Sequence, residues 1–163
     1  MNQPVYFYQK VSTTRYSFTS LGRRQIKKVV DFSPLVVGNM FNMGFGDLLP
    51  DGSIDDRANS NNGDIVKILS TVIHILKDFL DQLSDVEVFF TRSILQRTKL
   101  YARILKTYYV DFRKEFVITE IISTRDIYTQ ILFDPTTTQE CLGFLIKKNY
   151  LTWHHAISKR QSD

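Results

Sequence analysis

Residues 63–91 read GDIVKILSTVIHILKDFLDQLSDVEVFFT, and this stretch decides the fold because it joins a long helix to a strand. Large apolar residues recur every three or four positions, as one face of a helix requires. These apolar positions are Ile65, Ile68, Leu69, Val72, Ile73, Leu76, Phe79, Leu80 and Leu83. The opposite face is predicted to be solvent-exposed (the wet face), and it holds Lys67, Ser70, His74, Lys77 and Asp81.

We therefore predict a helix over residues 63–83. Asn61 or Asn62 can cap its first turn, and Asp64 suits the positive end of the helix dipole. Residues 86–91, VEVFFT, carry apolar side chains on both faces, which is typical of a central strand.

Upstream of this helix the sequence predicts four strands. Residues 5–8 and 15–19 are short, aromatic and separated by a polar turn, which indicates a hairpin. Residues 25–32 alternate imperfectly and stop before Pro34, which cannot donate to a ladder. Residues 40–47, MFNMGFGD, alternate most cleanly, with Phe41, Met43 and Phe45 on one face.

Downstream, Ser93 is predicted to cap a second helix that ends near Phe112. Its inner face comprises Ile94, Thr98, Tyr101, Leu105, Tyr108 and Phe112. Residues 116–122 and 127–133 are predicted to form a hairpin, and residues 142–146 can form one last strand.

The pattern predicts an α+β fold: a mixed, largely antiparallel sheet of about seven strands and two main helices, in the order ββββαβαββ(β). We expect a single domain over residues 1–148 and a C-terminal tail or short helix over 149–163, with Trp153, His154 and His155. The core is expected to include Phe45, Leu69, Val72, Leu76, Val88, Phe90, Tyr101 and Leu105.

Composition limits the classes of function. The 163 residues are 43% hydrophobic and carry a net charge of +4, so a phosphate or nucleic-acid ligand is compatible with the charge. The single cysteine, Cys141, excludes an intramolecular disulfide and a thiolate zinc site, and we expect it to be buried. The N-terminus lacks the basic and apolar regions of a signal peptide, and the apolar helix carries charges, so we expect a cytoplasmic protein with no membrane span.

The long polar loop over residues 49–62 is a candidate functional segment because connections of this length are uncommon. Asp47, Asp51, Asp55 and Asp56 lie in or beside it, but their spacing does not match a calcium-binding loop. His154 and His155 are adjacent and do not converge on one ion. No P-loop or local catalytic set is present, so we predict no metal site and no cofactor.

The second helix indicates a functional surface more strongly than the long polar loop does. Basic residues fall at helical spacings along one side, at Arg92, Lys99, Arg103, Lys106 and Arg113, and Arg97 and Lys114 add charge. They form either a solvated face or a phosphate-facing strip, with Tyr109 available for stacking. The phosphate or nucleic-acid candidates are Arg92, Arg97, Lys99, Arg103 and Lys106.

Two family resemblances follow from these segments. The stretches FNMGFGD, SNNGD, STVIHILKDF and RTKLYAR resemble an uncharacterised family of Bacteroidota, domain of unknown function 6934, over roughly residues 5–148. More weakly, the helix, strand, helix and hairpin resemble the C-terminal half of GCN5-related N-acetyltransferases. That resemblance implies a pyrophosphate site at Asn62 and Gly63, and Tyr101, after Leu100, as the general acid.

We expect a non-catalytic binding or regulatory protein that uses the basic helix and the long loop, because the basic strip occurs without a local catalytic constellation. Its partner would be a protein or a nucleic acid. The first alternative is an acyltransferase-like enzyme with Tyr101 as general acid. The second is a member of a bacterial two-gene toxin–antitoxin or defence module.

Overall fold

The computed structural model describes residues 4–57, 61–91, 95–137 and 140–150, and it confirms the α+β fold. Trp153, His154 and His155 lie outside the described residues, as does Ser93. Two 18-residue helices accompany the strands. The elements are β1 (Tyr8–Lys10), β2 (Arg15–Leu21), β3 (Gln25–Pro34), β4 (Met40–Leu48), β5 (Ile54–Asp55), α1 (Ile65–Gln82), β6 (Glu87–Thr91), α2 (Leu95–Phe112), β7 (Phe116–Thr124), β8 (Ile127–Leu132) and β9 (Gly143–Lys148).

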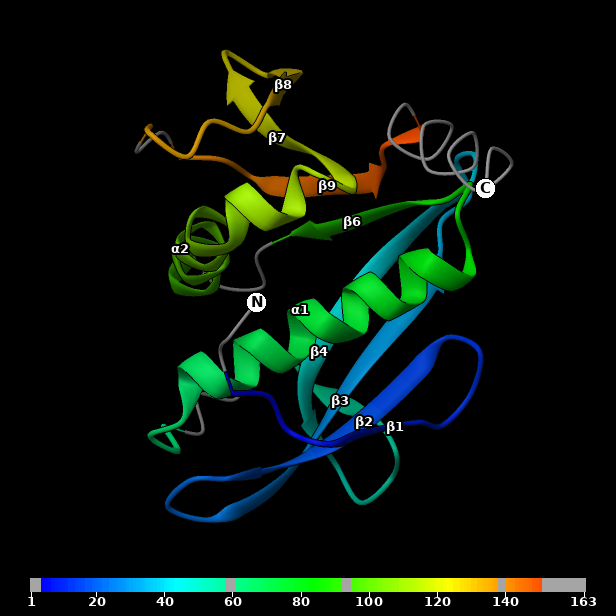
Figure 1. The fold of residues 1–163 in the computed structure, drawn as a ribbon, viewed down its shortest axis with the longest axis vertical. Helices are drawn as coiled ribbons and strands as arrows, with labels where there is room; N and C mark the ends of the chain where they lie inside the picture. The colour runs from blue at the N-terminus through cyan, green and yellow to red at the C-terminus, as the bar shows by residue number, and fades with distance from the viewer. Residues whose placement is uncertain (1–3, 58–60, 92–94, 138–139, 151–163) are drawn as a thin grey trace, which may run out of the picture.

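All the strands belong to one sheet with the order β1-β2-β3-β4-β6-β9-β7-β8, and β5 pairs with β4 beside this path (Figure 1). Every pairing is antiparallel except that of β4 with β6. The last strand, β9, lies between β6 and β7, so the chain returns to the middle of the sheet after it has built the β7–β8 hairpin.

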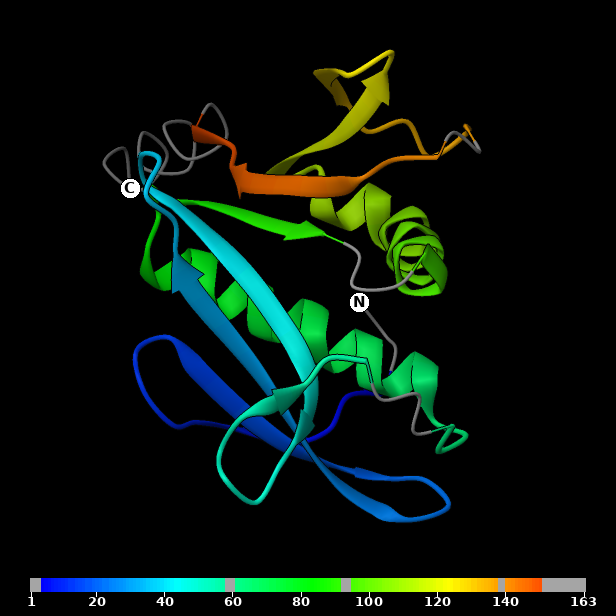
Figure 2. The same cartoon turned by 180° about the vertical axis from the view of Figure 1, so that it is seen from behind.

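The parallel pair β4 and β6 stays together only at its beginning. Three residue pairs are in register, from Met40 opposite Glu87 to Asn42 opposite Phe89. Beyond them the two strands diverge, as Figure 1 and Figure 2 both show. Helix α1 connects the two strands, as a parallel pair requires a crossover. The sheet is therefore split into a β1–β4 part and a β6–β9 part that join at one corner.

Both helices pack on the same face of the sheet. The Phe79 ring of α1 stacks on Phe32 of β3 at 3.8 Å between centroids and meets Phe41 of β4 at 5.3 Å. Tyr101 of α2 meets Phe90 of β6 edge-on at 5.3 Å. The register places Phe41 and Val88, and therefore Phe90, on one side of the sheet. All eight residues predicted for the core are buried, and Cys141 is buried as well.

The buried face of α1 includes a polar residue that the sequence placed in solvent, and it is shorter at both ends than the sequence indicated. Ser70, predicted on the wet face, is buried, and its hydroxyl lies 2.8 Å from the Tyr108 hydroxyl of α2. Ile65 and Leu83, predicted on the apolar face, are 46% and 38% exposed. Ser70 can be buried because its hydroxyl is hydrogen-bonded to the Val66 carbonyl of α1 and to the Tyr108 hydroxyl of α2.

The start of α1 also differs from the expectation. The N-cap residue is Asp64, and its side chain makes no capping hydrogen bond. Asn62 is buried and bonds instead to the β2–β3 hairpin: its side-chain oxygen accepts from the Arg24 N–H at 2.8 Å. Asn62 therefore connects the start of α1 to the β2–β3 hairpin instead of capping the N–H groups of the helix.

A charged residue of β3 is buried within the sheet. Lys28 is 3% exposed and forms an ion pair with Asp47, its register partner on β4. This explains the imperfect alternation in residues 25–32, because Lys28 occupies the same face as the buried Val30 and Phe32.

The short strand β5 covers the sheet face that lies away from α1 (Figure 2). It approaches closely enough that a Cβ at Gly46 would lie 2.3 Å from the Asp55 carbonyl oxygen. The glycines of MFNMGFGD are thus explained by backbone approach. No helix among the described residues is long and apolar enough to cross a membrane.

Candidate functional site

The exposed side of α2 holds the basic residues that the sequence singled out. Its inner side is buried through Tyr101, Ile104, Leu105, Tyr108 and Phe112. Lys99 and Arg103 lie one turn apart, and both are exposed. Within the described part of the chain, neither has a carboxylate partner within ion-pair distance. We call Lys99 and Arg103 the basic pair of α2.

Other predicted members of the strip are placed differently. Lys106 is half-buried, and its ammonium donates a hydrogen bond to the Thr137 carbonyl in the segment after β8. Arg92 lies outside the described residues, and so does the side chain of Arg97. Lys106 thus fixes a loop to the helix, while the basic pair of α2 faces solvent.

A buried acid lies close to Lys106. Glu120 of β7 is 4% exposed, and burial raises the pKa of its carboxyl. The nearby positive charge of Lys106 lowers this pKa, and the negative charge of Asp134 raises it. The Lys106 ammonium therefore offsets part of the cost of burying this acid. This arrangement is sufficient to explain why the fourth basic position of the helix is turned inward.

The carboxyl end of α2 carries paired charges. Arg113 is exposed and lies over the Tyr109 ring at 5.8 Å, so this tyrosine is already engaged on one face. Lys114 pairs with Asp111 at 3.2 Å, and Lys77 of α1 pairs with Glu115 at 2.9 Å. The Lys114 ammonium, which bonds to the Asp111 carboxyl, lowers the pKa of that carboxyl.

These two ion pairs border an open cavity of about 220 Å³, which Phe112 and Phe116 also line. Because its four charged residues neutralise one another, the cavity presents no unpaired acid or base. Such a hollow is also small for an organic ligand, since ligand sites typically measure about 300–1,000 Å³.

The long polar loop is organised by its own hydrogen bonds. One Asp51 oxygen accepts from the N–H and the hydroxyl of Ser53, at 2.9 and 2.6 Å, and these bonds lower the pKa of Asp51. An oxygen of Asp55 accepts from the Arg57 N–H at 3.1 Å. Among the described residues no group of three metal-ligating side chains converges. Residues 51–57 of the loop therefore resemble a structured turn.

The start of α1 is filled by a polar network. One oxygen of Asp64 accepts hydrogen bonds of 2.6 Å from the hydroxyls of Tyr6 and Ser20. The other oxygen is buried and has no partner within the described structure. The carbonyl of Asn62 accepts from the Arg23 N–H at 2.8 Å, and a Cβ at Gly22 would lie 1.9 Å from that carbonyl oxygen.

This network bears on the two residues that the acetyltransferase resemblance assigned to a pyrophosphate. The side chain of Asn62 is hydrogen-bonded to the backbone of the β2–β3 hairpin. Gly63 has a positive φ of 83° and lies beside Arg23. A carboxylate, that of Asp64, lies at the helix start where the phosphate would bind. Its negative charge opposes an anion there.

Tyr101, the other residue assigned by that resemblance, is 7% exposed, and its ring packs on Phe90. It belongs to the core cluster that joins α2 to β6. A general acid must reach a leaving group, whereas this residue is surrounded by protein.

One surface was not singled out by the sequence analysis. The outer strand β8 is uncharged from Ile127 to Leu132 and exposed along almost its whole length. The sequence does indicate an unprotected strand here, because the six residues IYTQIL contain no charge, proline or glycine.

Comparison with known proteins gives a family without an assigned activity. The model of a family of unknown function, DUF6934, matches residues 2–149, and the chain belongs to this family. No curated protein and no solved structure matches the chain.

Proposed function

We propose that this member of the DUF6934 family is a non-catalytic binding protein of the bacterial cytoplasm, and that it binds nucleic acid through the exposed side of α2. The observation that carries the proposal is the basic pair of α2: Lys99 and Arg103 are exposed, one helical turn apart, and without a carboxylate partner in the described part of the chain. Two such cations on one side of a helix supply the positive charge that contacts to a phosphate backbone require.

Several other cations of the described chain are paired with carboxylates, whereas Arg23 and Lys27 of the β2–β3 hairpin are, like the basic pair of α2, exposed and without a carboxylate partner in the described residues. Arg15 pairs with Asp31, Lys28 with Asp47, Lys77 with Glu115, and Lys147 with Glu87. Those cations already have partners, so a phosphate would have to compete for them. A phosphate that binds the basic pair of α2 would not have to displace a carboxylate, and the buried inner face of α2 holds the helix in place.

The test is the binding of short single- and double-stranded oligonucleotides at two salt concentrations, followed by fluorescence anisotropy. Each phosphate contact releases condensed counterions, so the affinity is expected to fall steeply as salt rises. Sequence dependence is expected to be weak, because phosphate contacts position a protein without reading bases. Absence of binding at low salt would refute the nucleic-acid proposal.

A second candidate is an acyltransferase-like enzyme with Tyr101 as general acid. The observation in its favour is the parallel β4–α1–β6 unit, whose strands diverge after three residue pairs. A crevice at the carboxyl ends of neighbouring parallel strands is a common ligand position in open sheets. The Asp64 carboxylate at the start of α1 and the burial of Tyr101 weigh against this candidate.

A third candidate is a member of a two-gene toxin–antitoxin or defence module, in which the partner is a protein. The exposed strand β8 is the feature compatible with a protein partner. Co-purification of the chain with the product of a neighbouring gene distinguishes this candidate from the first, because that complex should persist at a salt concentration that releases nucleic acid.

A further inference from the structure

The outer strand β8 is an open edge of the sheet. In the described structure β8 pairs with β7 and ends the strand order. Figure 1 and Figure 2 both show the β7–β8 hairpin projecting from the rest of the molecule. A strand in this position presents unpaired backbone N–H and C=O groups to any strand that approaches.

The side chains of β8 do not protect this edge. Ile127, Tyr128 and Leu132 are 67%, 72% and 72% exposed, and the strand carries no charge. The edge at the other end of the sheet is different: β1 is three residues long and ends in Lys10, whose ammonium bonds to Gln82 of α1. Proteins usually prevent pairing at an edge strand with lysine, with proline or by keeping the strand short. β1 is short and carries a lysine, whereas β8 has six residues and neither lysine nor proline.

The turn that precedes β8 determines which backbone groups face outward. Arg125 and Asp126 both have positive φ, 49° and 65°, as a two-residue type I′ turn requires. The flanking residues Thr124 and Ile127 are therefore a hydrogen-bonded pair. Hydrogen-bonded and outward positions alternate along the strand, so the N–H and C=O groups of Tyr128, Gln130 and Leu132 point away from β7.

We propose that β8 pairs with β8 of a second copy of this chain, antiparallel and about a two-fold axis at Gln130. In this register Gln130 lies opposite itself and Tyr128 lies opposite Leu132, so all three outward residues form hydrogen-bonded pairs. The exposed Tyr128 and Leu132 then cover each other on one face of the joined sheet, at both ends of the seam.

The second copy is the occupant that the strand itself favours. Residues 128–132 meet the same five residues in the opposite direction, and Ile127 meets Phe133, so no like charges face each other within β8 despite the net charge of +4. The projecting hairpin keeps the two protein bodies apart. A single strand pair buries less than the roughly 800 Å² per partner of a standard interface, so the dimer is expected to be weak.

Gln130→Lys tests the pairing, because it places two ammonium groups across the axis. Its matched control is Gln9→Lys, which adds the same charge to exposed β1 at the other edge. Sedimentation of the wild-type chain up to about 100 µM, where a complex of micromolar Kd is largely formed, should show a dimer. The dimer should be lost in Gln130→Lys and kept in Gln9→Lys. A wild-type chain that stays monomeric, or a dimer unaffected by Gln130→Lys, would overturn the proposal.

Cysteine cross-linking tests the register independently. In a hydrogen-bonded antiparallel pair the Cα atoms are about 5.5 Å apart, which a disulfide can span. Gln130→Cys should therefore form a covalent dimer on oxidation. Tyr128→Cys should not, because its two copies would lie about 14 Å apart along the strands. The natural Cys141 is buried and does not interfere. Cross-linking of Tyr128→Cys in preference to Gln130→Cys would contradict the proposed axis.

Discussion

At the scale of single residues, the sequence predicted burial better than it predicted polar partners. All eight core residues followed from apolar periodicity, because that signal is local. A partner that lies on a distant segment cannot be supplied by periodicity. Ser70 is the example: it was assigned to the solvent-exposed face, but it is buried, and its hydroxyl bonds both to the Val66 carbonyl of its own helix and to the Tyr108 hydroxyl, 38 residues away.

His74 gives a prediction at this scale. Burial lowers the pKa of His74 below its ordinary value of 6.5, so the folded chain resists protonation of this side chain. The unfolded chain binds the proton more readily, and the free energy of unfolding should therefore fall as pH decreases below about 6.5. One proton corresponds to a slope of at most about 1.4 kcal/mol per pH unit.

The measurement is urea denaturation between pH 7.5 and 5 for the wild type and for His74→Gln. The difference between the two curves isolates His74, because the other titrating groups contribute to both. The raised pKa of Glu120 acts in the opposite direction, since its protonated form is favoured in the folded chain. Parallel curves for the two proteins would show that His74 does not contribute.

At the scale of the elements, ten of the observed segments correspond to predicted ones, and β5 was missed. The boundaries moved most where tertiary contacts decide them: β1 begins at Tyr8 rather than Val5, because the earlier residues leave β2 and Tyr6 packs beside α1. β5 has two residues, too few for any period, and Asp55 approaches Gly46 across the sheet. The basic side of α2 was predicted, but the inward turn of Lys106 depends on Thr137 and could not be read from spacing.

The contact between α1 and α2 yields an element-scale prediction. Ser70→Ala and Tyr108→Phe each remove one hydroxyl of a buried hydrogen bond, and each should cost about 1 kcal/mol of unfolding free energy. The double variant should cost less than the sum, with a coupling of at least about 0.5 kcal/mol.

Thr107→Ala is the matched control for this cycle. Thr107 lies next to Tyr108 but is exposed, and its hydroxyl bonds to the Arg103 carbonyl of its own helix. Its effect should add to that of Ser70→Ala. Equal additivity for both pairs would mean that the Ser70–Tyr108 contact does not hold the helices together.

At the scale of the whole molecule, the sequence predicted the kinds of elements and their order along the chain, but not the order of the strands in the sheet. Nothing in residues 142–146 indicates that this strand enters between β6 and β7, because pairing across the chain leaves no local pattern. The divergence of β4 and β6 after three residue pairs was likewise unpredictable, because it leaves no pattern in either strand.

This split motivates a negative prediction about acyl-CoA. We expect no micromolar binding of acetyl-CoA in calorimetric titration, because the Asp64 carboxylate lies where a pyrophosphate would meet the start of α1. Asp64→Asn keeps the size of the side chain and removes the charge, so it separates repulsion from lack of space. Micromolar binding by the wild type would favour the acyltransferase-like enzyme over the binding protein.

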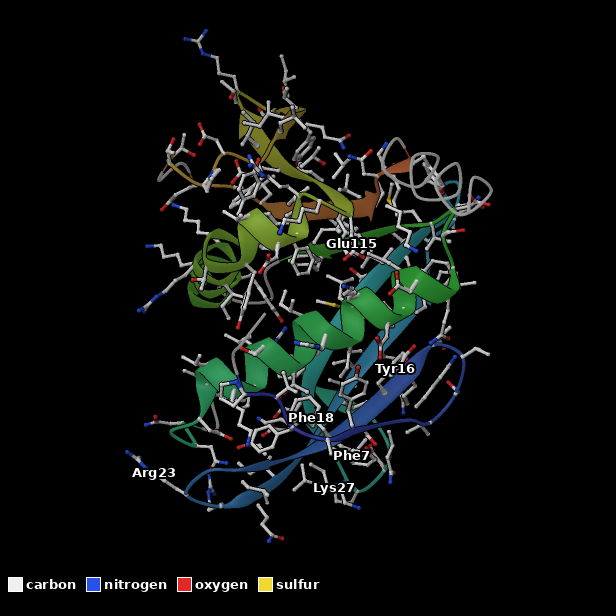
Figure 3. All side chains as sticks on the ribbon, viewed as in Figure 1. Phe7, Tyr16, Phe18, Arg23, Lys27 and Glu115 are labelled. Atoms are coloured by element: carbon white, nitrogen blue, oxygen red, sulfur yellow. The ribbon has the colours of Figure 1, made fainter. Side chains whose placement is uncertain are left out.

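The central claim is that the basic pair of α2 contacts phosphates, and the salt dependence of duplex DNA binding tests it most directly. Each contact should contribute about 0.9 to the slope of log K against log salt. Lys99→Ala should therefore flatten the slope by about 0.9 and weaken all sequences alike. The matched control is Lys27→Ala, an exposed lysine of β3 at the far end of the molecule (Figure 3), which should leave the slope unchanged. Equal slopes for Lys99→Ala and the wild type, or equal losses in Lys99→Ala and Lys27→Ala, would contradict the claim.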